Sequence, residues 1–326
     1  MGSAASIGGA VAGDYVTKYR PSPRLSRGVA PGVLVAAVRR RFSRTGLGAA
    51  VRGDAEPSTR VKDVALSPTA TLVALDHSTF LADQLRLHLR GTRDWVCTAF
   101  DAWLAGDAAS TDKLFWLTGA CGTGKSVAFA VLLDRQRGSG AFVAWHVCRH
   151  DDAAASKPAA LVRSLSAMLC ANVRGFEARL RADMRRVVEA GGDLDDMLPA
   201  DLFAVLIGGP LSRVRPPGKP CVIGIDALDE LPRKDLGAAL ALLAHSFPAL
   251  PAWVKVFVTS REAPRIRAAL TKKSTPLELK VDGLRNGEDV RAFLRHVARG
   301  RVDDHLSLDD VERGVEQAFP GVAVRG

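Results

Sequence analysis

The chain has 326 residues, of which 47% are hydrophobic, and this length fits one large domain or two ordinary ones with a sizeable core. It contains no apolar run near the roughly 18 residues that a membrane-spanning helix needs, so we expect no membrane span. The five cysteines are scattered and form no CxxC pair, which argues against a disulfide framework or a zinc site and favours a reducing, cytoplasmic location.

The net charge of +10 belongs mostly to the N-terminal segment. Residues 1–53 hold nine Lys and Arg and one acid, Asp14, which leaves 36 basic and 34 acidic residues, or +2, for the rest. The charge therefore gives no support to a nucleic-acid groove on the folded part. Residues 1–70 are rich in Gly, Ala, Ser, Pro and Arg without a sustained period, so we expect a basic, mostly disordered tail.

This tail fits two kinds of targeting signal. Residues 1–6 read MGSAAS, which fits the N-myristoylation pattern with Gly2 as the acceptor. One acyl chain anchors weakly, but a short basic amphipathic helix predicted over 32–42 could add the second signal for weak membrane association. The same acid-poor composition with Arg and Ser also fits an organellar transit peptide.

Beyond about residue 72 the pattern is that of a folded domain. The first helix is predicted over 94–105, within an N-terminal helical segment 92–105, because its apolar residues share one face. Strands and helices then alternate, which predicts an α/β, three-layer αβα fold with a mainly parallel five-stranded sheet. Strands are predicted over 113–118, 141–147, 221–226, 254–260 and 276–281, and helices over 125–136, 157–172, 174–190, 233–246, 262–270, 287–298 and 307–317. We assign the core to residues 75–281 and the start of a helical lid to 282–326.

A glycine-rich turn that fits GxxxxGK[ST] lies between the first strand and the next helix, the context in which this motif is specific. Its glycines let backbone N–H groups turn inward, and the helix N-terminus adds positive potential, so the turn predicts a cradle for a nucleoside triphosphate. Lys125 is expected to reach the β- and γ-phosphates, and the Ser126 hydroxyl to ligate Mg²⁺. A turn that binds nothing would have no use for this Gly-Lys-Ser ending. The predicted nucleotide-binding residues are Gly119, Ala120, Cys121, Gly122, Thr123, Gly124, Lys125 and Ser126.

Alternating polar residues follow the second strand, where His146, Cys148 and His150 would share one face. A metal site is geometrically possible there, but no fourth ligand lies nearby, so packing and polar contacts are the preferred interpretation. Cys121, inside the glycine turn, could be sensitive to oxidation, although a position that tolerates small residues is the simpler interpretation.

Acidic residues follow the apolar strand at 221–225 in the sequence DALDE, residues 226–230. Ligands gather at the carboxyl ends of the strands in open α/β sheets, so Asp226 is expected to hold Mg²⁺ directly or through water. Asp229 or Glu230 is expected to orient and deprotonate the attacking water. The alternative is the start of a capped helix with solvated acids.

The strand at 254–260 ends in two hydroxyls and an arginine, Thr259, Ser260 and Arg261. In a parallel sheet this end lies beside the phosphates, so Arg261 is expected to contact the γ-phosphate and stabilise the transferred charge. An arginine at a strand end can also be a plain surface residue.

Together, residues 119–126, 226–230 and 259–261 resemble the NACHT domain of STAND-class P-loop NTPases, with the DALDE sequence as the distinguishing element. Gly-Thr-Arg at 91–93 ahead of a Trp-bearing helix, WHVCRHDD at 145–152 and the stretch 281–295 resemble nephrocystin-type NACHT domains. The resemblance implies a switch that holds ADP when closed, exchanges it for ATP, opens and forms homo-oligomers, with slow Mg²⁺-dependent hydrolysis. The winged-helix lid and sensor repeats of that family are not visible, so we expect a truncated lid, in a fragment or a reduced member.

Other classes share the phosphate loop. A GTPase would need Asn-Lys-x-Asp, whereas Asn286 is followed by glycine and is interpreted as a helix cap. An ABC-type ATPase would carry Leu-Ser-Gly-Gly-Gln, and a small-molecule kinase would not need the second and third motifs. An AAA+ remodelling ATPase would place Glu directly after Asp226, where Ala227 stands. A non-hydrolysing scaffold stabilised by ATP would use the same binding residues and stays open.

Overall fold

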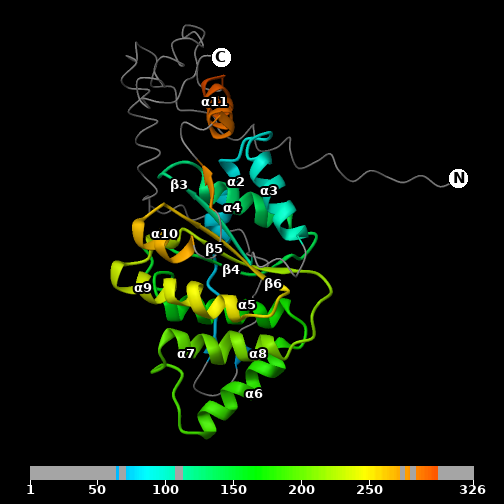
Figure 1. Cartoon of the computed structure of the whole chain (residues 1–326), viewed down its shortest axis with the longest axis vertical. Coiled ribbons are helices and arrows are strands. Elements are labelled where there is room, and N and C mark those ends of the chain that lie inside the picture. The colour runs from blue at the N-terminus through cyan, green and yellow to red at the C-terminus, as the bar shows by residue number, and fades with distance from the viewer. Residues whose placement is uncertain (1–63, 66–70, 107–112, 272–275, 280–283, 300–326) are drawn as a thin grey trace, which may run out of the picture. The chain divides into compact units, whose positions relative to one another are not determined.

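The computed structural model describes residues 64–65, 71–106, 113–271, 276–279 and 284–299, all within one compact unit, Gly46–Gly326 (Figure 1). The features predicted at Gly2 and over residues 32–42, the helix predicted over 307–317 and the later part of the predicted lid lie outside these residues. Two short strands, β1 (Val64–Ala65) and β2 (Thr71–Leu72), pair antiparallel; β1 lies inside the segment expected to be mostly disordered. None of the described helices is both long and apolar enough to cross a lipid bilayer.

The core is a parallel five-stranded sheet, as predicted. Its strands are β3 (Leu114–Gly119), β4 (Phe142–Val147), β5 (Cys221–Asp226), β6 (Val254–Ser260) and β7 (Leu277–Leu279), in the spatial order β4-β5-β6-β3-β7. The central strands of the sheet are β5, β6 and β3. Although β6 comes last of the three in the sequence, it lies between β3 and β5 and pairs in parallel with both. The carboxyl ends of these three strands meet at one edge, which is where the polar motifs lie.

Side chains alternate across the sheet and form two separate apolar cores, one on each face. On one face, Phe115, Val222 and Phe257 pack against α3 (Asp94–Ala105) and α4 (Lys125–Arg135). Gly224 gives this face room, because a Cβ there would lie 2.9 Å from a ring carbon of Phe129. Figure 1 shows α3 and α4 on the opposite side of the sheet from α5 (Pro158–Asn172) and α9 (Arg233–Ala241), which confirms the three-layer αβα arrangement of a P-loop fold.

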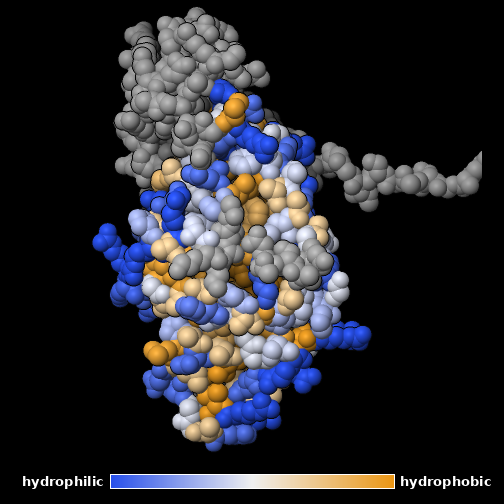
Figure 2. Space-filling model, in the orientation of Figure 1, coloured by the Kyte–Doolittle hydropathy of each residue, from blue (hydrophilic) through white to orange (hydrophobic). Residues whose placement is uncertain are grey.

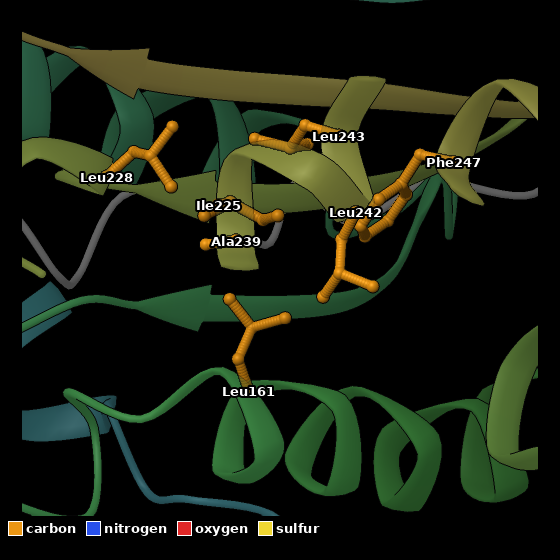
Figure 3. A pocket seen from close by; sticks show the side chains of 7 residues that line it. All are labelled: Leu161, Ile225, Leu228, Ala239, Leu242, Leu243 and Phe247. Carbon is orange, nitrogen blue, oxygen red and sulfur yellow. The ribbon is translucent and has the colours of Figure 1, made fainter. Parts of the chain in front are cut away.

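The other face is covered by more of the chain. Besides α5 and α9 it includes α6 (Phe176–Glu189), α7 (Pro199–Phe203), α8 (Gly209–Ser212) and α10 (Pro264–Leu270). Under the end of β5, apolar side chains from β5, α5, α9 and the turns that follow β5 and α9 converge and fill the space (Figure 3); they are Leu161, Ile225, Leu228, Ala239, Leu242, Leu243 and Phe247. The edge that carries the polar motifs therefore rests on a dry, packed layer.

Several elements differ from the sequence expectation. Helix α2 (Ser78–Arg86) and the helical stretch from α7 to α8, joined by a π-helical segment (Ala204–Gly208), were not predicted. The helix predicted over 233–246 changes to a π-helical turn at Leu242–Ser246 and is followed by a 3₁₀ turn at Phe247–Ala249. Helix α11 begins at Leu284, so Asn286 is a residue inside the helix and the prediction that it caps the helix was wrong.

The described surface is mixed rather than patterned. On the face shown in Figure 2, hydrophilic side chains cover much of the described helices and apolar ones appear between them. The large exposed apolar side chains of the described residues are scattered along the chain rather than grouped in one element: Val73, Leu87, Val188, Leu198 and Leu284.

Candidate functional site

The phosphate loop joins β3 to α4 in the conformation that its glycines allow. Gly122 and Gly124 have φ angles of 77° and 84°, in the left-handed region that glycine adopts without strain. Gly119 is needed for a different reason, because a Cβ there would lie 2.8 Å from the Leu279 carbonyl and from Thr123 Oγ1. Two strands and the loop thus approach closely around the N-terminus of α4.

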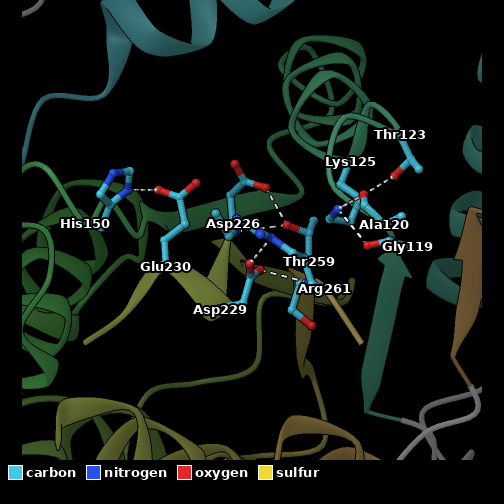
Figure 4. Close-up of polar contacts among 12 residues, drawn as sticks. Gly119, Ala120, Thr123, Lys125, His150, Asp226, Asp229, Glu230, Thr259 and Arg261 are labelled. Carbon is cyan, nitrogen blue, oxygen red and sulfur yellow. Dashed lines mark hydrogen bonds and ion pairs between the residues drawn. The ribbon is translucent and has the colours of Figure 1, made fainter. Parts of the chain in front are cut away.

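Lys125 is the first residue of α4, and its side chain folds back over the loop (Figure 4). Its Nζ donates hydrogen bonds to the carbonyl oxygens of Gly119 at 2.9 Å and Ala120 at 2.8 Å. Burial lowers the pKa of Lys125, and the charges of Asp229 and Asp226 oppose that shift. The ammonium therefore lies within electrostatic range of both carboxylates without being tied to either.

Asp226 ends β5 and is completely buried. Its Oδ1 accepts a hydrogen bond from Thr259 Oγ1 at 2.5 Å, whereas Oδ2 is buried with no hydrogen-bond partner among the described residues. Burial raises the pKa of Asp226 to about 6, and the hydroxyls of Thr259 and Ser126 oppose the shift. A buried carboxylate oxygen without a partner is costly, so this atom is suited to a cation.

A tight turn after Asp226 brings Asp229 to β6. Ala227 has a φ of 55°, unusual for a residue with a side chain, and residues Leu228–Glu230 form one 3₁₀ turn. Asp229 Oδ1 accepts the backbone N–H of Arg261 at 2.8 Å, and Oδ2 lies 2.7 Å from Arg261 Nε. Both oxygens of Asp229 are therefore engaged by Arg261, whose side chain remains 53% exposed while that of Asp229 is 11% exposed.

Glu230 points the other way along the edge, toward the loop after β4 (Figure 4). Its Oε2 lies 3.2 Å from Nδ1 of the exposed His150. His150 was considered in the sequence only as part of a metal trio. Its companions are occupied elsewhere, because His146 is buried with Nε2 3.0 Å from the Ala155 carbonyl and Cys148 is buried as well.

Within the described ranges, no group of three or more His, Cys, Asp or Glu side chains could hold a metal ion. This finding is compatible with magnesium, which binds proteins through one or two carboxylates and takes its other ligands from water and phosphates.

The structure brings the three predicted motifs to one edge. Asp226, Asp229 and Arg261 lie close enough for their charges to shift the pKa of Lys125, and the Ser126 hydroxyl lies close enough to Asp226 to lower the pKa of that carboxyl. Thr123 Oγ1 donates to the Ala120 carbonyl at 2.9 Å and steadies the loop, while Cys121 is exposed.

Two residues that organise this edge were named in the sequence analysis without a role for either one. Thr259 Oγ1 accepts the N–H of Ala227 at 2.9 Å and donates to Asp226, so it links the ends of β5 and β6. Arg93 donates to the Thr123 carbonyl at 2.7 Å from outside the loop. Only a weak signal was available for each: a hydroxyl at a strand end and an arginine before a Trp-bearing helix.

The fold and the loop define the class of protein. A parallel sheet covered by helices on both faces, with a GxxxxGKS turn between a central strand and a helix N-terminus, is the architecture of P-loop proteins.

A sequence profile described as nephrocystin 3, N-terminal, matches residues 91–261, which is 171 of the 326 residues and just over half of the chain. The chain belongs to this family. The matched segment runs from just before Arg93 to Arg261 and so includes every residue of the polar edge described above. No curated protein matches the chain.

Proposed function

We propose that this protein binds ATP with Mg²⁺ through the phosphate loop, hydrolyses it slowly to ADP and acts as a nucleotide-dependent signalling switch of the NACHT type within the STAND class. The observation that carries the proposal is the buried, unpartnered Oδ2 of Asp226, which lies at the same edge as Lys125 and Ser126. A cation would pair with this oxygen, and a polyanion would bring negative charge to the Lys125 ammonium, whose two hydrogen bonds go to carbonyl oxygens.

The residues fit a magnesium ion. Asp226 offers a carboxylate oxygen in a dry position, and Ser126 offers a hydroxyl beside it. When bound, Mg²⁺ would neutralise charge on the β- and γ-phosphates. Asp226 would then exist in its charged form, because a nearby cation favours the carboxylate over the neutral acid.

Lys125 suits a phosphate ligand for a similar reason. Its two hydrogen bonds go to loop carbonyls, which are uncharged acceptors. Phosphate oxygens carry full negative charge, so they would add a direct electrostatic attraction to the ammonium that uncharged carbonyls do not provide. The loop amides and the N-terminus of α4 would hold the remaining phosphate charge.

The carboxylates divide the hydrolytic roles. Asp229 is committed to Arg261 through both of its oxygens, so we assign it the holding of that arginine against the γ-phosphate. Glu230 has one oxygen paired with His150, and no described residue donates a hydrogen bond to its other oxygen. We therefore assign the orientation of the attacking water to Glu230 rather than to Asp229.

Preference for adenine and the formation of homo-oligomers on activation follow from the family resemblance. The guanine alternative is weakened by Asn286 and Asp289, because both bind Arg93 and are not free to read a base. An AAA+-like ATPase and a non-hydrolysing scaffold remain as outcomes of the test.

The test is Mg·ATP binding by isothermal titration and single-turnover hydrolysis with Lys125→Ala. Lys113→Ala is the matched control, since Lys113 Nζ also donates to two backbone carbonyls, those of Pro248 and Leu250, away from the loop. We expect loss of binding in the first variant only. Unchanged affinity in Lys125→Ala would overturn the proposal, and tight binding by the unmodified protein with no turnover would establish the scaffold instead.

A further inference from the structure

Arg93 lies between the phosphate loop and α11, in a position that the proposed function does not use. It directly precedes α3 and is only 8% exposed. Its φ of 67° lies in the left-handed region, which residues with a side chain rarely adopt. Such a backbone persists where surrounding contacts hold it.

On one side, Arg93 and Trp95 bind α11 (Leu284–Arg299), which lies near the start of α3 (Figure 1). The Arg93 backbone N–H and the Trp95 indole N–H both donate to Asp289 Oδ2, at 2.9 and 3.1 Å. Arg93 Nη1 donates to Asn286 Oδ1 and lies 3.2 Å from Asp289 Oδ2. Asn286 and Asp289 are only 2% and 8% exposed, so these hydrogen bonds are shielded from water.

On the other side, the same guanidinium holds the phosphate loop. Arg93 Nη2 donates to the Thr123 carbonyl at 2.7 Å. Because a trans peptide places its C=O and N–H on opposite sides, the N–H of Gly124 then points away from Arg93. The guanidinium also covers Gly124, where a Cβ would lie 2.7 Å from Nη2. Arg93 thus sets the direction of one amide in the loop.

We propose that Arg93 is a positioning residue for the phosphate loop and that it couples the loop to α11. The inference rests on the proposed function for its nucleotide, but the contact itself exists without one. Coupling is reciprocal: if docked α11 favours the loop conformation that binds phosphate, then bound Mg·ATP stabilises docked α11 to the same degree. Release of α11 would therefore weaken nucleotide binding through the loss of the Arg93 contacts with Asn286 and Asp289.

The decisive variant combines Asn286→Ala with Asp289→Ala on the full chain, because it leaves Arg93 and the loop intact. We expect its Mg·ATP affinity, measured by titration, to fall by about 5- to 150-fold, the usual range of allosteric coupling. Arg93→Ala should lose at least as much. Arg93→Lys should recover only part, because an ammonium lacks the fork that reaches both sides. Asp83→Ala, which removes the exposed ion pair with Arg86, is the matched control.

Amide hydrogen exchange separates coupling from a purely structural role of Arg93, because a structural role alone would not make exchange in α11 depend on nucleotide. We expect Mg·ATP to slow amide exchange in α11 of the unmodified protein but not in Arg93→Ala. In the nucleotide-free protein, the α11 variant should exchange faster over residues 119–126. Wild-type affinity together with unchanged loop exchange in the α11 variant would overturn the inference.

The two proposals fail differently. If the unmodified protein binds no Mg·ATP, the proposed function is wrong, and exchange over residues 119–126 in the nucleotide-free α11 variant still decides whether the coupling exists. If Arg93→Ala does not fold, the α11 variant decides alone, because its substitutions lie outside the loop and outside α3.

Discussion

Asp229 binds Arg261 through both carboxylate oxygens: Oδ1 accepts the backbone N–H of Arg261 at 2.8 Å, and Oδ2 lies 2.7 Å from the guanidinium Nε of Arg261. The contact joins the turn after β5 to the end of β6, which is the strand next to the phosphate-loop strand. It fixes where the arginine side chain leaves the sheet. It also occupies the carboxylate that would otherwise be free to activate water.

We expect Asp229→Asn and Arg261→Ala each to slow single-turnover ATP hydrolysis by roughly 10²-fold or more, in line with residues that stabilise the transferred phosphoryl group. Because the two side chains act as a unit, the double variant should be no slower than the worse single one. ATP affinity should change little in Asp229→Asn. Losses that simply multiply in the double variant would show that the two residues act independently.

Glu230→Gln should slow hydrolysis by about 10²- to 10⁴-fold while ATP affinity stays within a few-fold, because general-base catalysis depends on the charged carboxylate. His150→Ala should have a smaller effect, since it removes only a partner 3.2 Å away and leaves the carboxylate in place. A normal rate in Glu230→Gln would move the water-activating role to another group.

Thr259→Val should lower the free energy of unfolding by about 2–4 kcal/mol, because it leaves the Ala227 N–H and Asp226 Oδ1 buried without their hydroxyl partner. Thr98→Val is the control: its hydroxyl donates a hydrogen bond to the Asp94 carbonyl, but on an exposed helix surface. Urea titration should show a change within about 0.5 kcal/mol for the control. Equal effects in both variants would argue against the role of Thr259.

Two buried histidines should make stability fall in mild acid. Burial lowers the pKa of both His77 and His146 to about 4. Val147 N–H donates to His77 Nε2 at 3.3 Å, so this ring is a neutral acceptor that protonation would disrupt. The unfolded chain binds protons near pH 6.5 and the folded chain near 4, so each histidine destabilises the protein as pH falls between these values, by about 3 kcal/mol in full.

The measurement is the free energy of unfolding at pH 7, 5.5 and 4.5 for the unmodified protein, His77→Gln and His150→Gln. Asp226 acts in the opposite direction, since its pKa of about 6 stabilises the folded state as pH falls. The informative quantity is therefore the difference between variants. His77→Gln should show a shallower loss in acid, and the exposed His150→Gln should follow the unmodified protein.

Which elements could be predicted from the sequence depends on whether they are specified by neighbouring residues or by contacts between distant ones. The strands and the phosphate loop were predictable because apolar runs and the GxxxxGKS spacing are local patterns. The stretch at 199–212 was missed although its leucines, Phe203 and Ile207 are buried, because Gly208, Gly209 and Pro210 interrupt the helical pattern. Helix α2 was missed because its residues are mostly polar and none is fully buried.

For the site, the chemistry of Lys125, Ser126, Asp226 and Arg261 could be read from motifs, and parallel strands predicted that they would share an edge. Which carboxylate pairs with Arg261 could not be read, because Asp229 and Glu230 are adjacent and only the turn at Ala227 directs one to β6 and the other to His150.

By itself, the sequence determined that this is a P-loop α/β protein with a GxxxxGKS turn and acidic residues at the end of one strand, since those features depend on neighbouring residues and on the alternation of strands and helices. The tertiary structure alone decided the insertion of β6 between β3 and β5 and the contact of Arg93 with Thr123 and Asp289. The physical reason is distance along the chain: Arg93 and Asp289 are 196 residues apart, and no local preference specifies such a pair before the chain folds.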